Sequence, residues 1–408
     1  AGATRAVSAV THHYDWPPSL VPPPPPLRIL MASPPPSAPG PLPKHTPLLV
    51  EGLRSLGCQV STAAWGSGEG ERSLGERVAG RVKDLLRIWW MAARSSTDVV
   101  VVKTAHDWAT LARDIPLMMG LRVVASARVI QFHGSQPESL LQGGRPLFRV
   151  ATRLLLATVS AVLVLSREEK RLWGAFRPAT PIYVVKNPHR PRPALPEPCG
   201  LGEEVGIGAG ASSLPGRTDE NDAPVVLFVG RLIAPKGVLD LVEAAGMLAA
   251  STPDLPLRVV MAGDGPEAAS IMSRARALGI ADRVTLTGHV DTRALGRLYG
   301  RAWFLALPTS HPEGFPTVIA EAMAAGLPIV TTPIRGAVDY LEDGVNALFI
   351  PAGEPAALAR AMRRLLKDAE LRRSMGERNR ARVALFSPDR VAREYLEALR
   401  QAVEVATA

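Results

Sequence analysis

Short apolar runs alternate with stretches of helical periodicity along most of the chain. The run at residues 98–103, DVVVVK, has four successive valines, which is typical of a strand covered on both faces of a parallel sheet. Such strands are expected at 27–32, 59–63, 98–103, 123–131, 161–166 and 182–185, with helices at 46–56, 73–94, 145–158 and 168–176. Helices that alternate with strands in this way predict a doubly wound parallel α/β sheet.

The alternation starts again after an interruption. Residues 191–222 are rich in Pro, Gly, Ser and acidic residues and predict a partly disordered linker. Residues 1–26 end in five prolines and predict a disordered tail. Further strands are expected at 225–230, 257–262, 284–287, 305–307, around 330 and at 347–350, with helices at 237–250, 267–278, 292–300, from 316, at 355–366 and at 388–403. The chain therefore divides into a first domain, 27–190, and a second domain, 223–387.

Positive charge is concentrated in the first half of the chain. Residues 1–190 contain 23 Lys and Arg against 12 Asp and Glu, whereas residues 191–408 contain 24 against 26. Such a field favours anionic partners, among them lipid headgroups and phosphorylated acceptors.

The two cysteines, Cys58 and Cys199, cannot form a disulfide framework or a cysteine-based zinc site, so a cytoplasmic protein is expected. No signal core appears near residue 1, and the longest apolar run, 154–165, is shorter than the roughly 20 residues that span a bilayer.

The stretch at residues 308–330, PTSHPEGFPTVIAEAMAAGLPIV, joins two expected strands through a helix whose start faces the carboxyl edge of the sheet. Pro316 suits the first helical position, because its missing N–H would have no partner there. Glu313 then precedes the helix and Glu321 lies inside it. The free N–H groups at Thr317 and its neighbour favour phosphate binding, although acidic residues near a helix start also stabilise helices of any function.

The first strand of the second domain runs into the sequence VVLFVGRLIAPKG at residues 225–237. Arg231 offers a planar fork and Lys236 a point charge, and both suit phosphate oxygens. Isolated cations after a strand are usually solvated surface charges. The stretch also resembles a diphosphate-binding motif of the family described next, in which Glu313 and Glu321 follow in the expected order, and that resemblance favours a joint site.

The motif E-G-F-P-x4-E-A-M-A-A-G-L-P at residues 313–328 resembles the signature of the retaining glycosyltransferases of family 4, in glycosyltransferase group 1. The resemblance covers about 27–192 and 223–403 and is stronger in the second half. It implies the GT-B fold, in which two Rossmann-like domains face each other across a cleft. It also implies that the first domain binds the acceptor and that the helix at 388–403 packs back onto that domain.

By the same resemblance, the second domain binds a nucleoside-diphosphate sugar. Arg231 and Lys236 would hold the diphosphate as charge builds on it, Glu313 would bind hydroxyls of the transferred sugar, and Glu321 would bind the ribose. The implied catalytic residues are Glu313, Lys236, Arg231 and His133. The implied donor-binding residues are Gly40, Gly230, Gly237, Gly288, His289, Val290, Gly314, Phe315, Pro316, Thr317 and Glu321.

His133 follows the expected strand at 123–131 and resembles the family histidine that approaches the donor, although a lone histidine on an apolar element is commonly a core residue. Gly40 lies in the loop after the first strand, where it would let backbone approach the phosphates. This loop departs from the family pattern, because prolines surround a single glycine where adjacent glycines are common.

In retaining members of the family, the acceptor hydroxyl attacks from the face that the diphosphate leaves, and a phosphate oxygen takes the proton. No Asp-x-Asp triplet occurs, so neither a divalent metal nor another cofactor is expected. The loop after the first strand lacks G-x-G-x-x-G, which argues against a nicotinamide dehydrogenase. No nucleic-acid partner is expected.

The helix at 73–94 is basic and amphipathic. Val78, Val82, Leu85 and Trp89 form one stripe, and Lys83, Arg87, Trp90 and Arg94 lie on another side. The favoured interpretation buries the first stripe on the sheet. The alternative is peripheral contact of residues 73–94 with an anionic membrane at its inner face.

The main hypothesis is a cytoplasmic, retaining glycosyltransferase that moves a sugar to a glycan, lipid-linked or small-molecule acceptor, with a role in cell-envelope or polysaccharide biosynthesis. One alternative is a nucleotide-sugar epimerase on the same fold, which needs no acceptor. The other is a non-catalytic subunit that binds the donor.

Overall fold

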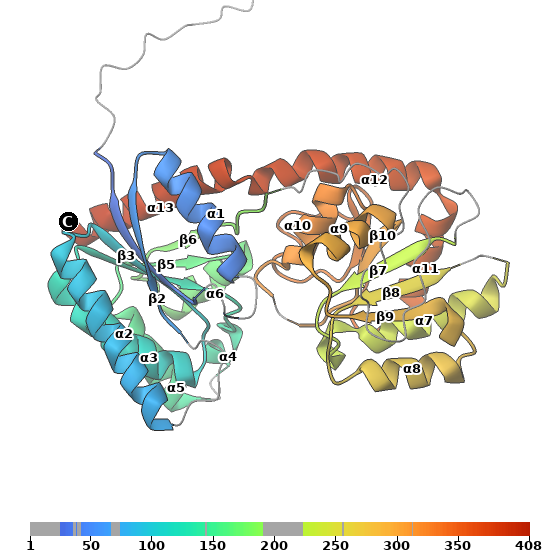
Figure 1. Cartoon of the computed structure of the whole chain (residues 1–408), viewed down its shortest axis with the longest axis horizontal. Helices are drawn as coiled ribbons and strands as arrows, with labels where there is room; N and C mark the ends of the chain where they lie inside the picture. The colour runs from blue at the N-terminus through green and yellow to red at the C-terminus, as the bar shows by residue number, and fades with distance from the viewer. Residues whose placement is uncertain are drawn as a thin grey trace, which may run out of the picture.

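The protein is represented by a computed structural model (Figure 1), which describes residues 25–35, 38, 42–66, 74–142, 145–190, 223–254, 257–311 and 313–408. Most of the predicted tail, Gly40 and the predicted linker at 191–222 lie outside these residues. Two layered bodies lie side by side, and the C-terminal helix runs from one to the other.

The first domain is built on a parallel sheet in the order β2-β1-β3-β4-β5-β6. Its strands are β1 (Arg28–Ser33), β2 (Gln59–Ala64), β3 (Val99–Thr104), β4 (Ala127–Phe132), β5 (Ala161–Val164) and β6 (Ile182–Val184). Its helices are α1 (Leu42–Ser55), α2 (Leu74–Arg94), α3 (Trp108–Val124), α4 (Glu138–Leu141), α5 (Pro146–Leu156) and α6 (Arg167–Phe176).

The second domain has a parallel sheet in the order β12-β11-β10-β7-β8-β9. Its strands are β7 (Val225–Val229), β8 (Arg258–Ala262), β9 (Val284–Gly288), β10 (Phe304–Leu307), β11 (Ile329–Thr331) and β12 (Ala347–Phe349). Its helices are α7 (Val238–Ser251), α8 (Ala268–Ala277), α9 (Thr292–Arg301), α10 (Thr317–Ala325), α11 (Pro355–Lys367) and α12 (Ala369–Arg382), with 3-10 turns η1 (Ala234–Lys236), η2 (Ala281–Arg283) and η3 (Val383–Phe386). The predicted fold class is confirmed.

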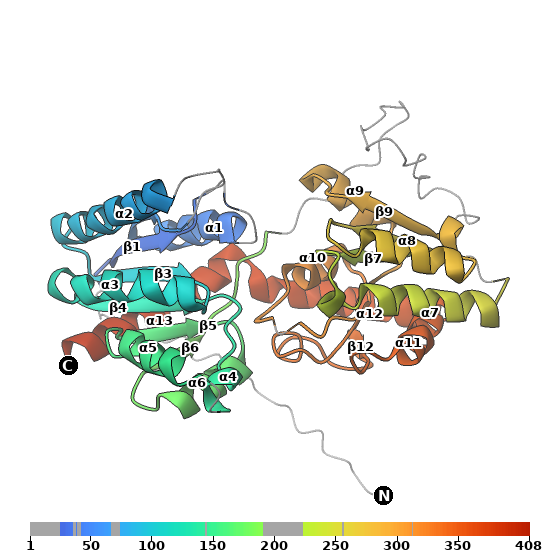
Figure 2. The ribbon, with the colours of Figure 1, turned by 90° about the horizontal axis from the view of Figure 1, so that it is seen from below.

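Helices cover both faces of the first sheet. Because side chains alternate along each strand, neighbouring residues enter opposite cores. In β1, Ile29 and Met31 join the core under α1 and α13 (Pro388–Thr407), whereas Leu30 and Ala32 join the core under α2 and α3. Figure 2 shows α1 and α2 as separate elements of this domain in the view from below. This burial on both faces explains why β3 has four successive valines: Val99 and Val101 enter one core, and Val100 and Val102 enter the other.

Several predictions of elements and boundaries are wrong. Neither α3 nor α12 was predicted, and α13 extends to Thr407 rather than ending at residue 403. The strand predicted at 123–131 overlaps the end of α3 and begins at Ala127. The apolar sequence continues from α3 towards β4, and periodicity alone does not divide such a run. Helix α1 begins at Leu42 rather than at residue 46. Helix α10 begins at Thr317, and Pro316 is its N-cap in an extended conformation.

Helix α13 belongs to the core of the first domain although it follows the second in the chain. Tyr395 and Leu399 are fully buried, and the Tyr395 hydroxyl donates a hydrogen bond of 2.9 Å to Gln131 Oε1 in β4. The chain therefore crosses between the domains twice.

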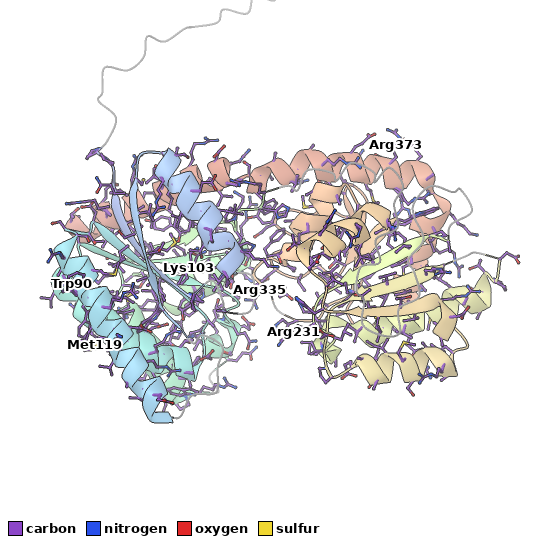
Figure 3. All side chains as sticks on the ribbon, viewed as in Figure 1. Trp90, Lys103, Met119, Arg231, Arg335 and Arg373 are labelled. Carbon is purple, nitrogen blue, oxygen red and sulfur yellow. The ribbon has the colours of Figure 1, made fainter. Side chains whose placement is uncertain are left out.

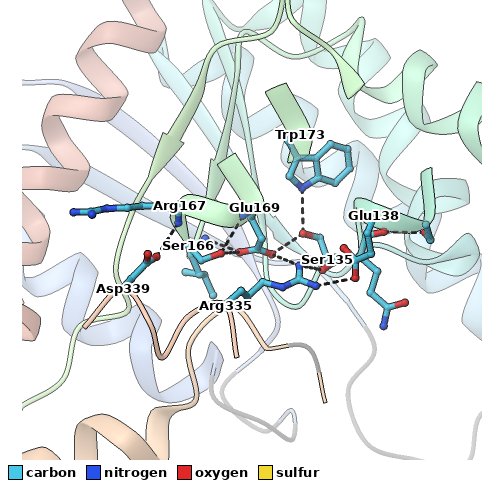
Figure 4. Close-up of polar contacts among 11 residues, drawn as sticks. Ser135, Glu138, Ser166, Arg167, Glu169, Trp173, Arg335 and Asp339 are labelled. Carbon is cyan, nitrogen blue, oxygen red and sulfur yellow. Dashed lines mark hydrogen bonds and ion pairs between the residues drawn. The ribbon is translucent and has the colours of Figure 1, made fainter. Parts of the chain in front are cut away.

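A second connection is polar and centres on Arg335, in the loop after β11 (Figure 4). Its side chain is 7% exposed and donates to the Ser135 carbonyl oxygen at 3.0 Å and to Glu138 Oε1 at 2.8 Å. Glu169, fully buried in α6, lies 3.9 Å from the same guanidinium. Nearby, the Arg167 N–H donates to Asp339 Oδ2 at 2.8 Å. Arg335 thus brings a cation of the second domain to the carboxylates of the first.

We expect the variant Arg335→Met to separate the domains. Removing one member of a buried ion pair costs about 3–5 kcal/mol, and here the cost falls on the closed arrangement, because opening returns Glu169 to water. The radius of gyration, measured by small-angle X-ray scattering, should increase. Arg378→Met is the control, since that exposed arginine contacts Val345 within its own domain. A wild-type radius for Arg335→Met would contradict this role.

Candidate functional site

The loop after β7 is held against the loop after β10 by a close approach of backbone. Gly237 has φ 68°, and a Cβ at this position would lie 2.1 Å from the Pro308 carbonyl oxygen, so only glycine fits. The Pro235 carbonyl oxygen accepts hydrogen bonds from the N–H groups of Ser310 at 2.8 Å and His311 at 3.1 Å. Lys236 is thereby fixed beside the segment that carries Glu313.

Lys236 and Glu313 form an ion pair, so the structure joins two residues that the sequence assigned to different parts of a donor. Burial and the charge of Arg231 lower the pKa of Lys236 to about 8, although the Glu313 carboxylate contacts it. Burial and the same two cations lower the pKa of His311. Figure 3 labels Arg231 on the side of the second domain that faces the first. Arg231 and Lys236 outnumber the single carboxylate of Glu313, so the group keeps a net positive charge that suits phosphate oxygens.

Glu321 lies in α10 and accepts a hydrogen bond of 2.9 Å from the Tyr299 hydroxyl of α9. This bond fixes the orientation of a partly exposed carboxylate. The sequence analysis did not find Tyr299, because nothing in α9 shows which helix faces it. Phe315 is 8% exposed and stacks on Phe386 at 4.8 Å, so its side chain anchors the loop and only its backbone can serve a ligand.

Gly314, which follows Glu313, is buried at the interface between the two domains. A Cβ at Gly314 would approach Leu165 Cβ of the first domain to 2.8 Å. A Cβ at Gly336 would lie 1.5 Å from the Gly314 carbonyl oxygen, so this loop also packs tightly on the loop of Arg335. Any shift of Arg335 therefore reaches the segment that holds Glu313.

Gly288, His289 and Val290, which were predicted to bind the donor, lie at the end of β9, and β8 separates that strand from β7. The Gly288 carbonyl oxygen accepts a hydrogen bond from the Gly263 N–H at 2.9 Å. His289 is exposed, and Val290 is half-buried against the core. Gly230 ends β7 and donates its N–H to the Ala262 carbonyl oxygen at 3.0 Å. These positions share the carboxyl edge of one sheet, as expected for a ligand site of this fold.

His133 follows β4 in the first domain, and its N–H donates to the Thr104 carbonyl oxygen at 2.8 Å. Nε2 of its ring is buried without a hydrogen-bond partner. Burial and the neighbouring Lys103 and His45 hold the pKa of His133 well below its usual value. The loop that follows is tied to the second domain, because the Ser135 carbonyl oxygen is bound by Arg335.

Several of these residues escaped the sequence analysis. Arg335, Glu169 and Tyr299 carry no local signal, since their partners are distant in the chain. Lys103 did carry a local signal, because it is a lysine in a strand that was expected to be covered on both faces. Within the parts of the chain that the structure describes, no three His, Cys, Asp or Glu residues gather as metal ligands.

Helix α2 buries only half of the predicted stripe: Leu85 and Trp89 pack against the core, whereas Val78 and Val82 do not. Ile88 and Ala92 are fully buried, and the Trp89 indole N–H donates to the Leu117 carbonyl oxygen at 3.0 Å. Val78 and Val82, predicted in the core, are 55% and 52% exposed. They share the exposed face with Leu86 and Trp90, because α3 covers the C-terminal half of α2. Among the described helices, none is long and apolar enough to cross a membrane.

Comparison with known proteins adds the family. A model described as "Glycosyl transferases group 1" matches residues 215–382. The alpha-D-kanosaminyltransferase of Streptomyces kanamyceticus is 30% identical over 287 residues, which cover 67% of this chain and 70% of that protein. The D-inositol 3-phosphate glycosyltransferase of Nocardia farcinica is 29% identical over 320 residues, which cover 76% of this chain and 63% of that protein, slightly under two thirds of its length.

Solved structures agree on the architecture. HepE of Anabaena covers 92% of this chain and all of its own, with a TM-score of 0.67 and 18% identity. Sucrose-phosphate synthase of Thermosynechococcus elongatus covers 92% of this chain and 98% of its own, with a TM-score of 0.68 and 19% identity. At such identities the likeness is one of fold, and that fold is GT-B. With the two sheets, the motif at 313–328 and the kanosaminyltransferase alignment, it follows that this chain belongs to the glycosyl transferases group 1, a family of glycosyltransferases.

Proposed function

We propose that the protein transfers a sugar from a nucleoside-diphosphate sugar to an acceptor, with retention of configuration at the reacting carbon. The observation that carries the proposal is the ion pair of Lys236 and Glu313 beside Arg231, in front of α10. The solved HepE structures, which contain UDP or UDP-glucose, support a nucleotide-sugar donor.

In the proposed reaction, Arg231 and Lys236 stabilise the negative charge that develops on the leaving diphosphate. Glu313 binds hydroxyls of the transferred sugar and orients Lys236, with which it already pairs. Glu321, held by Tyr299, accepts hydrogen bonds from the ribose. The acceptor hydroxyl attacks from the face that the diphosphate leaves, and a phosphate oxygen takes its proton. This scheme requires neither a metal nor another cofactor.

The acceptor is proposed to bind the first domain, and glycans, lipid-linked sugars and small molecules are its candidate classes. Acceptors of this kind place the protein in cell-envelope or polysaccharide synthesis on the cytoplasmic side of the membrane. The positive charge of residues 1–190 supports an acceptor or a surface that is anionic.

A panel of UDP-, GDP-, ADP- and TDP-sugars tests the donor. A matching donor at 100 times its dissociation constant should stabilise the protein by about 2.7 kcal/mol, which a thermal-shift assay detects. Incubation with candidate acceptors should then consume that donor. An epimerised donor would identify the epimerase instead, and binding without turnover would identify a donor-binding subunit.

The affinity for nucleoside diphosphate should decrease as the pH rises through about 8. Lys236 holds its proton only below this pH, because burial and Arg231 lower its pKa, and a neutral amine cannot pair with phosphate. The loss should approach tenfold per pH unit in titration calorimetry. Lys236→Met should remove this dependence and lower kcat by roughly 10².

The exposed Lys367→Met is the matched control for charge, since Lys367 ends α11. It should keep both the rate and the pH profile of the wild type. Normal turnover of Lys236→Met would remove the proposed clamp.

We also propose that α2 contacts an anionic membrane surface. Val78, Val82, Leu86 and Trp90 are spaced by four residues, so they form one stripe on the helix, and all are more than half exposed. The exposed cations of α2 include Arg81, Lys83, Arg87 and Arg94. Figure 3 labels Trp90 and Met119 on the outer side of the first domain. An apolar stripe bordered by cations suits the headgroup region.

Flotation with phosphatidylserine vesicles tests this surface. The wild type should float at low salt and dissociate as salt screens its charges. Trp90→Ala should lower the bound fraction roughly tenfold through the loss of buried aromatic area. Val405→Ala, at a half-exposed apolar position on α13, should bind as the wild type does. Failure of the wild type to float at low salt would count against membrane contact.

A further inference from the structure

Lys103 is a buried lysine in β3, with 1% of its surface exposed. Among the described residues no carboxylate pairs with it, and burial lowers its pKa to about 7. Its contacts are a long hydrogen bond of 3.4 Å to Thr46 Oγ1 and the ring of Tyr395, 5.9 Å from Nζ. A buried charge of this kind is costly unless a partner neutralises it.

Two histidines lie close to Lys103. His45, 7% exposed in the first turn of α1, has Nδ1 buried without a hydrogen-bond partner, and so does Nε2 of His133 after β4. Lys103 Nζ lies 3.4 Å from Oγ1 of Thr46, the neighbour of His45, and the His133 N–H donates at 2.8 Å to the carbonyl oxygen of Thr104, which follows Lys103. In agreement, Lys103 lowers the pKa of both histidines. Unpartnered polar atoms are rare in protein interiors, so two unpartnered ring nitrogens beside a buried lysine need an explanation.

The group also lies where ligands of such folds bind. β3 and β4 end at the same edge of the parallel sheet, and the first turn of α1 presents N–H groups to it. The loop after His133 is held by Arg335, so the group borders the second domain. Figure 3 labels Lys103 in the first domain and Arg231 in the second, so the two groups of cations belong to different domains.

We propose that Lys103, His45 and His133 bind an anionic group, a phosphate or a carboxylate, that the acceptor carries. This inference rests on the proposed function, since it names the chemical class of the acceptor. The diphosphate of the donor already has cations in the second domain, whereas no anion among the described residues pairs with Lys103, and an incoming one would favour its charged form. An incoming oxyanion would neutralise the lysine and accept hydrogen bonds from the ring nitrogens and from Thr46.

Inorganic phosphate is the probe, titrated by calorimetry into the full chain while UDP, GDP, ADP or TDP saturates the donor site. We expect the wild type to bind phosphate under these conditions. Lys103→Met should weaken that binding at least tenfold and leave nucleotide affinity unchanged. Lys44→Met is the control, because it removes the same charge from the exposed neighbour of His45.

Stability distinguishes a ligand site from a structural role. Replacing an unpaired buried charge by an apolar group of similar length should leave the melting temperature of Lys103→Met equal to that of the wild type or higher. A large decrease would assign Lys103 to the core and overturn the proposal. His45→Gln keeps the lysine and should also weaken phosphate binding.

Two other outcomes overturn the inference. If the wild type binds no phosphate beside the nucleotide, the site does not exist. If Lys103→Met weakens nucleotide and phosphate alike, the group serves the donor. If no nucleotide binds at all, the proposed function fails, but the phosphate titration does not depend on that result. Phosphate binding that depends on Lys103 can still be measured in the absence of nucleotide.

Discussion

The contact of Gly237 with Pro308 is the constraint on which the candidate donor site depends. It brings the loop after β7 within reach of the loop before α10, and the hydrogen bonds to the Pro235 carbonyl oxygen keep the two in register. These contacts fix the position of Lys236 beside Glu313, with which it forms an ion pair. A side chain at residue 237 would separate the loops and the charges with them.

The two domains are joined by unlike means. Helix α13 is a permanent part of the first core, because its apolar face is fully buried there. The contacts of Arg335 are polar and local, and water can replace them when the domains part. Such a pair of connections keeps the domains together while leaving their separation adjustable, which suits a protein that must admit two substrates.

Charge is arranged differently in the two domains. In the second domain, Lys236 has Glu313 as its partner, so the site is nearly balanced. In the first, Lys103 and two histidines lie together without a carboxylate among the described residues that pairs with them. Part of the excess positive charge of residues 1–190 thus lies inside the first domain, and part of it lies along α2. Both places favour anions, one as a bound group and one as a surface.

The sequence by itself determined the two parallel sheets, the family and the candidate positions around Lys236 and Glu313, because periodicity and a contiguous motif are local properties of the chain. It failed where an apolar run had to be divided, at α3 and β4, and where the extent of the neighbouring helix decided burial, at Val78 and Val82. The tertiary structure decided which distant residues meet, among them Arg335 with Glu169, Tyr299 with Glu321 and His45 with Lys103. Those pairings depend on how sheets and helices pack, and no local pattern encodes that geometry.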